Sequence, residues 1–396
     1  MRVLMVSDVY FPRINGVSTA IDTYRRTLAA EDIEVKLVAP DYGHPCEQEW
    51  ITRIPSKPVP RDPEDRLMRW SQLSHAVLDA ARDCDLIHVQ TPFLAHYAAT
   101  RAAKKLKLPI MATYHTLFEE YFKHYAPLVP APLLKAIARR FSRTQCDAMD
   151  AVIVPSRAIH QRLNDYGTSA PLHILPTGIP LARFASGDRH GFRQRHGIPE
   201  QQPVALYVGR VAHEKNLDYL LDAVAMARSR VPDILLLITG EGPALPHLRD
   251  KVKREGLEHN VRFIGYLDRT LELPDCYAAA DAFVFASRTE TQGLVLIEAM
   301  AMGLPVVALS VMGTADILDG ARGARVPRDS TEDFATVLAD LLLDTASHAQ
   351  LANEAREHAQ QWNELALASR MAALYRETLR LHRSGSQHEL LPETMA

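Results

Sequence analysis

The sequence predicts an α/β protein built from two doubly wound domains, each a parallel sheet with helices on both faces. One observation behind this fold class is the length of 396 residues, which exceeds one compact core and suits two ordinary domains. The other is the repeated alternation of short apolar, β-branched runs with longer helical patterns. A content of 47% hydrophobic and 23% charged residues lets both domains bury a core and excludes wholesale disorder.

The first round of strands and helices fills the N-terminal part of the chain. The turn at residues 15–18 precedes a helix expected over 19–30, and a Pro-rich loop over 55–63 leads to a helix expected over 65–83. The strands predicted in this round are the apolar runs 3–6, 35–40, 86–89, 109–114 and 151–155.

A second round follows a short joint at residues 176–180, whose two prolines and one glycine suit a partly stiff connection. The strands predicted beyond the joint, each separated by a helical stretch, are 204–209, 234–239, 261–265, 282–286 and 305–308. We therefore expect one domain over 1–178, a second over 179–383 that includes the C-terminal helices from Thr331 onward, and a disordered polar tail over 384–396.

The net charge of -3 is divided unequally along the chain. Residues 1–183 hold 23 Lys and Arg against 19 Asp and Glu, whereas the remainder holds 22 against 29. Such an asymmetry indicates a charged partner for the basic half, or simply solvated surface. The near-neutral total and the lack of ligand-spaced Cys and His pairs argue against nucleic acid as a partner.

The four cysteines and the apolar segments indicate the cellular compartment in which the protein works. Cys46, Cys84, Cys146 and Cys276 are scattered without a C-x-x-C pair, so we expect buried thiols rather than disulfides or a zinc site. The N-terminal apolar run is too short for a signal peptide, and no stretch approaches the roughly 18 apolar residues of a membrane span. We expect a cytoplasmic protein, with any membrane contact peripheral, on the inner face of the cytoplasmic membrane.

Two carboxylates follow the predicted strand 282–286. Glu290 lies in the loop before a helix that Gly293 would open, and Glu298 lies on the second turn of that helix. Carboxylates accept hydrogen bonds from sugar hydroxyls, and free N–H groups at a helix start suit an anion. The alternative is a solvated loop glutamate and a helix glutamate favoured by the macrodipole.

Two cations follow the predicted strand 204–209. Arg210 and Lys215 lie in the loop that starts at Gly209, and a planar guanidinium with a nearby ammonium suits a diphosphate. Basic loop residues are often merely solvated, but ligands of doubly wound sheets bind beyond the carboxyl ends of the strands, where this loop lies.

With these motifs the sequence resembles the retaining glycosyltransferases of family four, from residues 10–17 to the helices past Thr331. Glu290 and Glu298 match the family's E-x7-E pair, Gly209, Arg210 and Lys215 match its G-R-x-x-x-x-K loop, and Gly16 matches its N-terminal glycine loop. The resemblance implies the GT-B type of fold, in which two Rossmann-like domains face each other across a cleft.

The resemblance also implies roles in binding a nucleotide-diphosphate sugar, with UDP-glucose favoured. Glu290 would bind the sugar hydroxyls, Glu298 the ribose hydroxyls, and Arg210 and Lys215 the diphosphate. The other donor-binding residues it implies are Gly16, Gly209, Gly240, Gly265, Tyr266, Leu267 and, through backbone N–H groups, Thr291, Gln292, Gly293 and Leu294.

The chemistry of sugar transfer is consistent with these residue types. Breaking a sugar–phosphate bond leaves negative charge on the departing diphosphate, which fixed cations and N–H dipoles stabilise. We expect neither a metal nor another cofactor, because Arg210 and Lys215 supply that charge and no carboxylate cluster suggests a magnesium site. The family retains the anomeric configuration, with the departing phosphate accepting the acceptor's proton.

His115, just past the predicted strand 109–114, is the candidate catalytic residue of the first domain, where the acceptor would bind. The alternative is a structural histidine bonded to a nearby carbonyl. Residues 115–125 follow the pattern H-T-x-[YF]-E-[DE]-Y-x-x-H-Y, which resembles that of diacylglycerol glucosyltransferases but has one residue more between Tyr121 and His124 than the version expected of those enzymes. The resemblance implies Glu119, Tyr121 and His124 as acceptor-binding residues.

A basic helix is predicted over 133–143. Leu133, Leu134, Ile137 and Phe141 share one face, while Lys135, Arg139 and Arg143 share another. Such a helix suits an anionic membrane surface, but an ordinary amphipathic helix with its apolar face in the core has the same pattern. A second basic cluster comprises Arg101, Lys104, Lys105 and Lys107.

The hypothesis that follows is a retaining hexosyltransferase that moves glucose from UDP-glucose onto a lipid hydroxyl such as that of diacylglycerol. One alternative transfers mannose or another hexose to phosphatidylinositol or a soluble acceptor. Two further alternatives are a non-hydrolysing epimerase and a non-catalytic sugar-binding protein.

Overall fold

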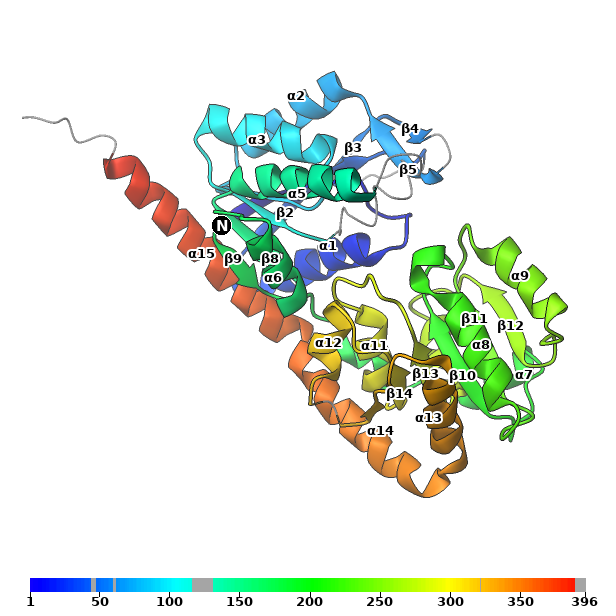
Figure 1. Cartoon of the computed structure of the whole chain (residues 1–396). Helices are drawn as coiled ribbons and strands as arrows, with labels where there is room; N and C mark the ends of the chain where they lie inside the picture. The colour runs from blue at the N-terminus through cyan, green and yellow to red at the C-terminus, as the bar shows by residue number, and fades with distance from the viewer. Residues whose placement is uncertain (44–47, 60–61, 116–130, 321, 389–396) are drawn as a thin grey trace, which may run out of the picture. The chain divides into compact units, whose positions relative to one another are not determined.

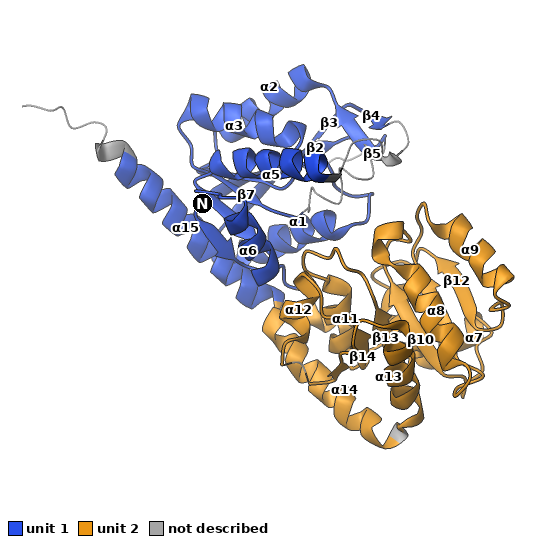
Figure 2. Ribbon diagram, viewed as in Figure 1, with its two compact units in different colours: residues 1–178, 364–396 blue, residues 179–363 orange. Residues whose placement is uncertain are grey.

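The computed structural model describes residues 1–43, 48–59, 62–115, 131–320 and 322–388. The chain divides into two compact units, which Figure 2 colours separately. Unit 1 comprises residues 1–178 and 364–396, and unit 2 comprises residues 179–363. The chain therefore leaves unit 1 once and returns to it at the C-terminal end.

Unit 1 is built on a seven-stranded parallel sheet in the order β3-β2-β1-β6-β7-β8-β9 (Figure 1). Residues 3–6 of the central strand β1 are fully buried, as expected where helices cover both faces of a parallel sheet. The strands are β1 (Arg2–Val6), β2 (Glu34–Pro40), β3 (Ile51–Ile54), β6 (Leu86–Val89), β7 (Ile110–Thr113), β8 (Ala151–Val154) and β9 (Leu172–Ile174).

The helices of unit 1 begin at polar caps where the sequence provides them. The Asn15 side chain accepts the N–H of Ser18, and the Ser156 side chain accepts that of Ile159, so each satisfies an N–H of the first helical turn. The described helices of this unit are α1 (Gly16–Thr27), η1 (Leu28–Glu31), α2 (Trp70–Ala81), α3 (Leu94–Leu106), α5 (Ala131–Asp147), α6 (Arg157–Asp165) and α15 (Glu364–His388).

Unit 2 repeats the same architecture with a six-stranded parallel sheet in the order β12-β11-β10-β13-β14-β15. Its strands are β10 (Val204–Val208), β11 (Leu235–Thr239), β12 (Val261–Gly265), β13 (Ala282–Phe285), β14 (Val306–Ala308) and β15 (Ala324–Arg325). Its described helices are η2 (Leu181–Phe184), α7 (Arg189–Arg195), η3 (His213–Lys215), α8 (Leu217–Ala227), α9 (Leu245–Arg254), α10 (Glu272–Ala279), α11 (Leu294–Ala301), α12 (Gly313–Leu318), α13 (Thr331–Leu343), α14 (Thr345–Ala359) and η4 (Gln360–Trp362).

The predicted fold class of two doubly wound α/β domains is confirmed by these two sheets. Each predicted strand is present and ends within one residue of its expected bounds. In unit 1 the loops after β1, β6 and β7 leave the carboxyl edge of one sheet, and in unit 2 those after β10 to β13 leave the carboxyl edge of the other. Ligand-binding residues are expected at those edges.

One stretch of the first round was predicted wrongly. The expected loop over 55–63 and the beginning of the helix expected over 65–83 form an antiparallel hairpin of β4 (Ser56–Val59) and β5 (Asp62–Met68), and α2 begins only at Trp70. Cross-strand pairing removes residues up to Met68 from the helix, and Met68 is itself buried. The proline at position 58 is compatible with this pairing because the hairpin is a separate two-stranded sheet.

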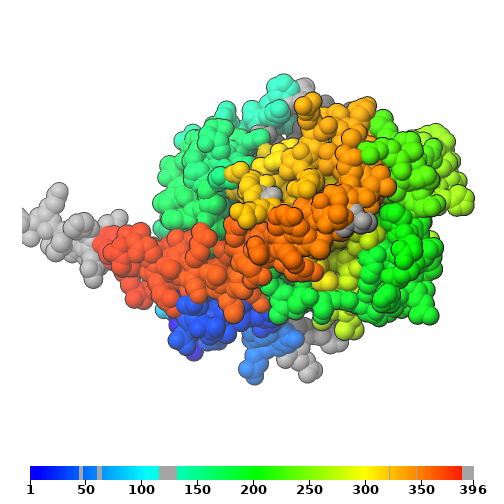
Figure 3. Space-filling model, turned by 90° about the horizontal axis from the view of Figure 1, so that it is seen from below, coloured from blue at the N-terminus to red at the C-terminus, as the bar shows by residue number. Residues whose placement is uncertain are grey.

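The C-terminal helix α15 belongs to unit 1, so the predicted extension of the second domain to residue 383 is wrong for residues 364–383. Tyr375 on α15 is fully buried, and its hydroxyl lies 2.6 Å from Nδ1 of His88 on β6. Figure 3 shows the outer side of α15 on the surface of the unit, beside α1, which it also contacts. Residues 384–388 of the expected disordered tail continue the helix, and 389–396 lie outside the described residues.

The described cysteines are free and buried, as predicted for Cys84, Cys146 and Cys276, while Cys46 lies outside the described residues. In the described ranges no helix combines the length and apolar character needed to cross a membrane. Those ranges also contain no group of three or more His, Cys, Asp or Glu side chains arranged to hold a metal ion.

Candidate functional site

The loops after β10, β11 and β12 are joined backbone to backbone at the carboxyl edge of the unit 2 sheet. Gly209 donates its N–H to Thr239 O at 3.1 Å, and Gly240 donates to Gly265 O at 2.7 Å. Gly240 has a φ of 118°, and a Cβ there would lie 2.0 Å from Gly209 O, so only glycine allows this approach. The structure thus brings together Gly209, Gly240 and Gly265, which the sequence had placed in separate motifs.

The remaining predicted residues of these loops, Arg210, Tyr266 and Leu267, follow the glycines in the chain. Arg210 follows Gly209, and its carbonyl accepts the Tyr207 hydroxyl at 3.0 Å. Tyr266 is exposed and Leu267 half-buried at the end of β12. Arg210 and Tyr266 therefore each follow a glycine of the hydrogen-bonded loops at this edge of the sheet.

Lys215 and Glu290 meet directly. Lys215 Nζ forms an ion pair with Glu290 Oε1, and their side chains are 21% and 18% exposed. Asn216 joins the same two loops, because its Nδ2 donates to Ala286 O at 3.1 Å. The cation of one predicted motif and the carboxylate of the other thus form one partly buried pair.

The loop that carries Glu290 ends at the start of α11. Gly293 caps this helix with a φ of 97°, a left-handed conformation that favours glycine. Glu290 O accepts the N–H of Gly313 at 2.9 Å, and a Cβ on Gly313 would lie 2.1 Å from Thr291 O, so the loop is held closely against α12. Thr291, Gln292, Gly293 and Leu294 therefore lie at a helix N-terminus, where backbone N–H groups and the helix dipole favour an anion.

Glu298 on α11 is only 1% exposed, and both of its oxygens have partners. Arg269 Nη2 donates to Oε1, and the Tyr277 hydroxyl donates to Oε2 at 2.9 Å. The Glu298 charge raises the pKa of Arg269, while burial and the same charge raise the pKa of Tyr277. Arg269 and Tyr277 were not predicted, because only the fold brings the β12–α10 loop and α10 to this carboxylate.

His115 follows β7 in unit 1, where its Nε2 lies 3.1 Å from Oε1 of Gln90. Burial lowers the pKa of His115 to about 4, so the ring is neutral near neutral pH. A glutamine Oε1 only accepts hydrogen bonds, which assigns the proton to Nε2 and leaves Nδ1 as the acceptor atom. Gln90 was not predicted, although it follows a predicted strand at the same sheet edge.

A cavity of about 30 Å³ lies beside His115. It is bordered by β6, β7, β8, α3 and α5, and among the described residues that line it none is Lys, Arg, Asp or Glu. Burial also lowers the pKa of His96 to about 4, so its imidazole is neutral as well. The polar residues that line the cavity are Thr91, His96, Thr113, Tyr114, His115 and Gln145.

Asp8, which the sequence analysis missed, lies at the same edge after β1. Its carboxylate accepts the Thr91 hydroxyl at 2.7 Å and the N–H of Ala95 at 3.1 Å, in the first turn of α3. Burial raises the pKa of Asp8 to about 6 against the effect of these bonds. Gly16 is exposed at the start of α1, and beyond its chain neighbours and its own helix no atom of the described residues lies within 4 Å of the place where its Cβ would be.

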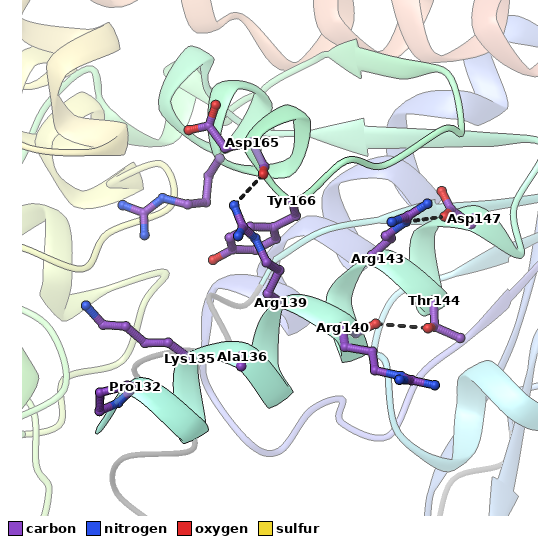
Figure 4. A pocket seen from close by; sticks show the side chains of 11 residues that line it. Pro132, Lys135, Ala136, Arg139, Arg140, Arg143, Thr144, Asp147, Asp165 and Tyr166 are labelled. Atoms are coloured by element: carbon purple, nitrogen blue, oxygen red, sulfur yellow. Dashed lines mark hydrogen bonds and ion pairs between the residues drawn. The ribbon is translucent and has the colours of Figure 1, made fainter. Parts of the chain in front are cut away.

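Two other predictions concern α5 and the segment before it. Glu119, Tyr121 and His124 lie outside the described residues, so their acceptor-binding roles stay predictions. On α5 the cations Lys135, Arg139 and Arg143 are exposed as the pattern predicted (Figure 4). The predicted apolar face divides, since Leu134 is buried whereas Leu133 and Ile137 are 52% and 48% exposed. The rotation of α5 about its own axis relative to the sheet decides which of these side chains are buried, and the sequence pattern does not determine that rotation.

We predict that unit 1 loses stability in acid because His88, His96 and His115 are buried as neutral rings, with pKa values lowered to about 3, 4 and 4. Below about pH 6.5 the histidines of the unfolded chain bind protons, whereas the buried rings of the native protein do not. Each buried ring therefore lowers the free energy of unfolding by roughly 1.4 kcal/mol for every pH unit of acidification. The pKa of Asp8 is raised to about 6, so between about pH 6 and 4 the native carboxyl binds a proton that the unfolded chain does not. Over that range Asp8 cancels the loss of stability caused by one of the histidine rings.

The measurement is the free energy of opening of unit 1 peptides by hydrogen exchange between pH 7 and 5. His96→Leu removes one buried ring, so the slope of the free energy of opening against pH should fall by roughly 1.4 kcal/mol per pH unit. Substitution of the exposed His75 by Gln should leave that slope unchanged. An unaltered slope in His96→Leu would contradict the prediction.

Each of the two units matches a glycosyltransferase family model. The family model described as Glycosyl transferases group 1 matches residues 188–358, and that described as Glycosyltransferase Family 4 matches residues 14–183. The chain is 32% identical to an alpha-monoglucosyldiacylglycerol synthase of Streptococcus pneumoniae over 78% of this chain and 71% of that protein. It is 29% identical to a sulfoquinovosyl transferase of Arabidopsis thaliana over 91% of this chain and 70% of that protein.

Other similar proteins act on different substrates or share the fold. A D-inositol 3-phosphate glycosyltransferase of Jonesia denitrificans is 31% identical over 74% of this chain and 72% of its own length. Sucrose-phosphate synthase of Thermosynechococcus elongatus has a similar structure, with a TM-score of 0.79 at 22% identity over 96% of this chain and 99% of that one. Anabaena HepE in complex with UDP-glucose gives 0.74 at 19% identity over 95% of this chain and 100% of that one.

Proposed function

Since the chain belongs to glycosyltransferase family 4 and is a glycosyltransferase of the GT-B fold, we propose that it transfers glucose from UDP-glucose to the hydroxyl of an uncharged lipid such as diacylglycerol, with retention of configuration. The single observation that carries the proposal is the Lys215–Glu290 pair at the N-terminus of α11. It combines a cation, a carboxylate and backbone N–H groups within one loop cluster.

The proposed donor site uses that cluster as follows. Lys215, Arg210 and the first N–H groups of α11 stabilise the negative charge that develops on the departing diphosphate. Glu290 accepts hydrogen bonds from sugar hydroxyls, and its pairing with Lys215 fixes the position of the carboxylate. The departing phosphate accepts the proton of the incoming hydroxyl. No metal enters this proposal, because the protein's own cations carry the charge.

Glu298 is proposed to accept hydrogen bonds from the ribose. Each oxygen of a carboxylate has more than one lone pair, so the bonds from Arg269 and Tyr277 leave acceptor capacity. These two partners fix the plane of the carboxylate. Tyr266, Leu267 and Gly265, at the end of β12, are proposed to lie near the base, and the exposed Gly16 keeps the start of α1 open for the donor.

The acceptor is proposed to be an uncharged alcohol. The described residues that line the cavity beside His115 carry no charge, and the neighbouring imidazoles are neutral, so this part of the lining suits a hydroxyl group better than an anionic acceptor. The similarity to alpha-monoglucosyldiacylglycerol synthases supports diacylglycerol in particular. His115 is proposed to contact the donor sugar or the incoming hydroxyl through Nδ1. The exposed Lys135, Arg139 and Arg143 are proposed to bring the protein to an anionic membrane surface.

A second candidate is transfer of mannose or another hexose to an inositol-containing or soluble acceptor. The similarity to a GDP-mannose-dependent alpha-mannosyltransferase and to D-inositol 3-phosphate glycosyltransferases favours it. The uncharged side chains that line the cavity in the described part of the chain argue against an inositol phosphate there.

A screen of donors and acceptors tests the proposal. We expect release of UDP from UDP-glucose when diacylglycerol is present in mixed micelles, and little release with GDP-mannose, phosphatidylinositol or D-inositol 3-phosphate. Greater turnover with GDP-mannose and an inositol acceptor would favour the second candidate. Conversion of UDP-glucose to another UDP-sugar without acceptor would indicate an epimerase instead.

A further inference from the structure

Asn216 connects the two loops that carry the Lys215–Glu290 pair. The strands β10 and β13 are neighbours in the sheet of unit 2, so the loops that follow them lie side by side (Figure 1). Asn216 comes directly after Lys215, and its Nδ2 donates to Ala286 O at 3.1 Å, at the carboxyl end of β13. Glu290 lies four residues beyond Ala286. The amide of Asn216 therefore joins the loops next to the ion pair.

The backbone of Asn216 has a conformation that most side chains disfavour. Its φ of 58° and ψ of 39° lie in the left-handed region, which Asn tolerates better than most other residues besides glycine. Its N–H donates to His213 O at 3.1 Å, which closes the short helix η3 before α8 begins. The turn at Asn216 thus fixes the end of the loop that carries Lys215.

The side chain of Asn216 does not serve the helix that it precedes. An asparagine at this position usually caps the helix by accepting an N–H of the first turn. In the part of the chain that the structure describes, the Asn216 side chain makes no such bond to α8. Its amide donates to the neighbouring loop instead, so the contact between the loops is what this side chain stabilises.

Two other hydrogen bonds between these loops are longer. The hydroxyl groups of Ser287 and Thr289 both donate to Glu214 O, at 3.5 and 3.4 Å. Hydroxyl hydrogen bonds are normally about 2.5–3.0 Å long, so these two contribute little. Of the three, the bond from Asn216 is the shortest.

The other end of the loop is held by Tyr207. This residue of β10 is fully buried, and its hydroxyl donates to Arg210 O at 3.0 Å. Burial raises the pKa of Tyr207, so the hydroxyl keeps its proton and remains a donor. The loop is therefore fixed at Arg210 and again at Asn216, and each of its two proposed phosphate-binding cations lies at or beside a fixed point.

We propose that Asn216 is a positioning residue for sugar transfer, because its bond to Ala286 O holds the ammonium of Lys215 against Glu290. The inference rests on the proposed function for the role of Lys215 at the departing diphosphate. An ammonium has three N–H donors, and the bond to Glu290 uses one of them. A cation fixed in advance needs no rearrangement when negative charge develops on the phosphate.

Steady-state kinetics of Asn216→Gly test this role. Glycine adopts the left-handed conformation freely, so the substitution removes the amide and keeps the turn. We expect kcat to fall by about tenfold or more while KM for the donor changes by less than about threefold, because a displaced ammonium loses its contact with the transition state. Asn216→Asp fits the same backbone but replaces the donor by an acceptor, and should lower kcat at least as far. A kcat within about twofold of the unaltered chain in both variants would overturn the inference.

A double-mutant cycle with Lys215→Met shows whether Asn216 acts through that lysine. In the Lys215→Met chain, Asn216→Gly should lower kcat by less than about threefold, since the group that it positions is already gone. An equal fall of kcat with and without Lys215 would overturn the positioning role.

The matched control is Asn260→Gly, which removes a buried amide from the same unit. The Nδ2 of Asn260 donates to Pro232 O at 3.0 Å and to Ile234 O at 2.9 Å, directly before β12 and so at the opposite edge of the sheet. This variant should lose stability in urea but keep kcat within about twofold. A loss of kcat equal to that of Asn216→Gly would overturn the inference in favour of general loosening of unit 2.

The outcomes also separate this inference from the proposed function. If UDP-glucose supports no transfer, the proposed function is refuted, and the same cycle with the nucleotide sugar that the donor screen identifies decides the role of Asn216. Transfer from UDP-glucose that Asn216→Gly leaves unchanged would refute the positioning role and leave the proposed function standing.

Discussion

Replacing Glu290 by Gln is expected to lower the rate of hexose transfer by about 10²–10³-fold while the affinity for UDP changes little. Gln has nearly the same shape but cannot accept strong hydrogen bonds from sugar hydroxyls through a charged group, nor form the ion pair with Lys215. UDP lacks the sugar, so its binding depends on the cations and N–H groups that the variant keeps. Initial rates with UDP-glucose and calorimetric binding of UDP measure the two effects.

The control for this prediction is Glu258→Gln, an exposed carboxylate of the same unit, which should leave the rate unchanged. Lys215→Met should impair transfer as well, and the double substitution should cost less than the sum of the two, because each residue is the partner of the other. A Glu290→Gln rate within about threefold of the control would contradict the assignment of this site.

Replacing Arg193 by Met is expected to destabilise unit 2 by about 3–5 kcal/mol. Arg193 on α7 is 1% exposed, and its guanidinium Nη2 lies 3.0 Å from Asp281 Oδ2. The carbonyls that accept its remaining hydrogen bonds, at 2.8–3.0 Å, are those of Ala279, Pro199, Glu200 and Gln202. The substitution leaves four backbone carbonyls without this donor and removes one of the two guanidinium groups that bond Asp281, which costs far more than the methionine gains by packing.

Hydrogen exchange of unit 2 peptides in increasing urea measures that loss. Arg195→Met on the same helix removes one exposed ion pair with Asp275 and should cost less than about 1 kcal/mol. If Arg193→Met were as stable as Arg195→Met, the buried network would contribute nothing and the prediction would be wrong.

The strands could be predicted closely because each is a continuous apolar run, a pattern that depends only on the chain itself. Apart from the β4–β5 hairpin, the strands that were missed, β3, β9 and β15, are two to four residues long and lie at the edges of the two main sheets. Edge strands are covered less, so their residues need not be uniformly apolar. The docking of α15 was missed for another reason, since the partner of Tyr375 is a histidine 287 residues earlier in the chain.

The residues of the candidate site also separate into those that the sequence predicts and those that only the fold brings together. Gly209, Arg210, Lys215, Glu290 and Glu298 were recognisable because they follow strands in motifs with fixed spacing. Arg269 and Tyr277 bond Glu298, Gln90 bonds His115, and Asp8 bonds the start of α3, each from a different segment of the chain, so no local pattern identifies them. The burial of Glu298 against Arg269 arises only when the β12–α10 loop folds against α11. Such partners become visible only in three dimensions.

The proton NMR spectrum of the lipid product formed by the purified chain from UDP-glucose and diacylglycerol tests the central claim most directly. The proposal predicts a single lipid-linked glucose whose anomeric proton has the α configuration, the same as in the donor. A β-linked glucose, or free glucose with no glucosylated lipid, would contradict it.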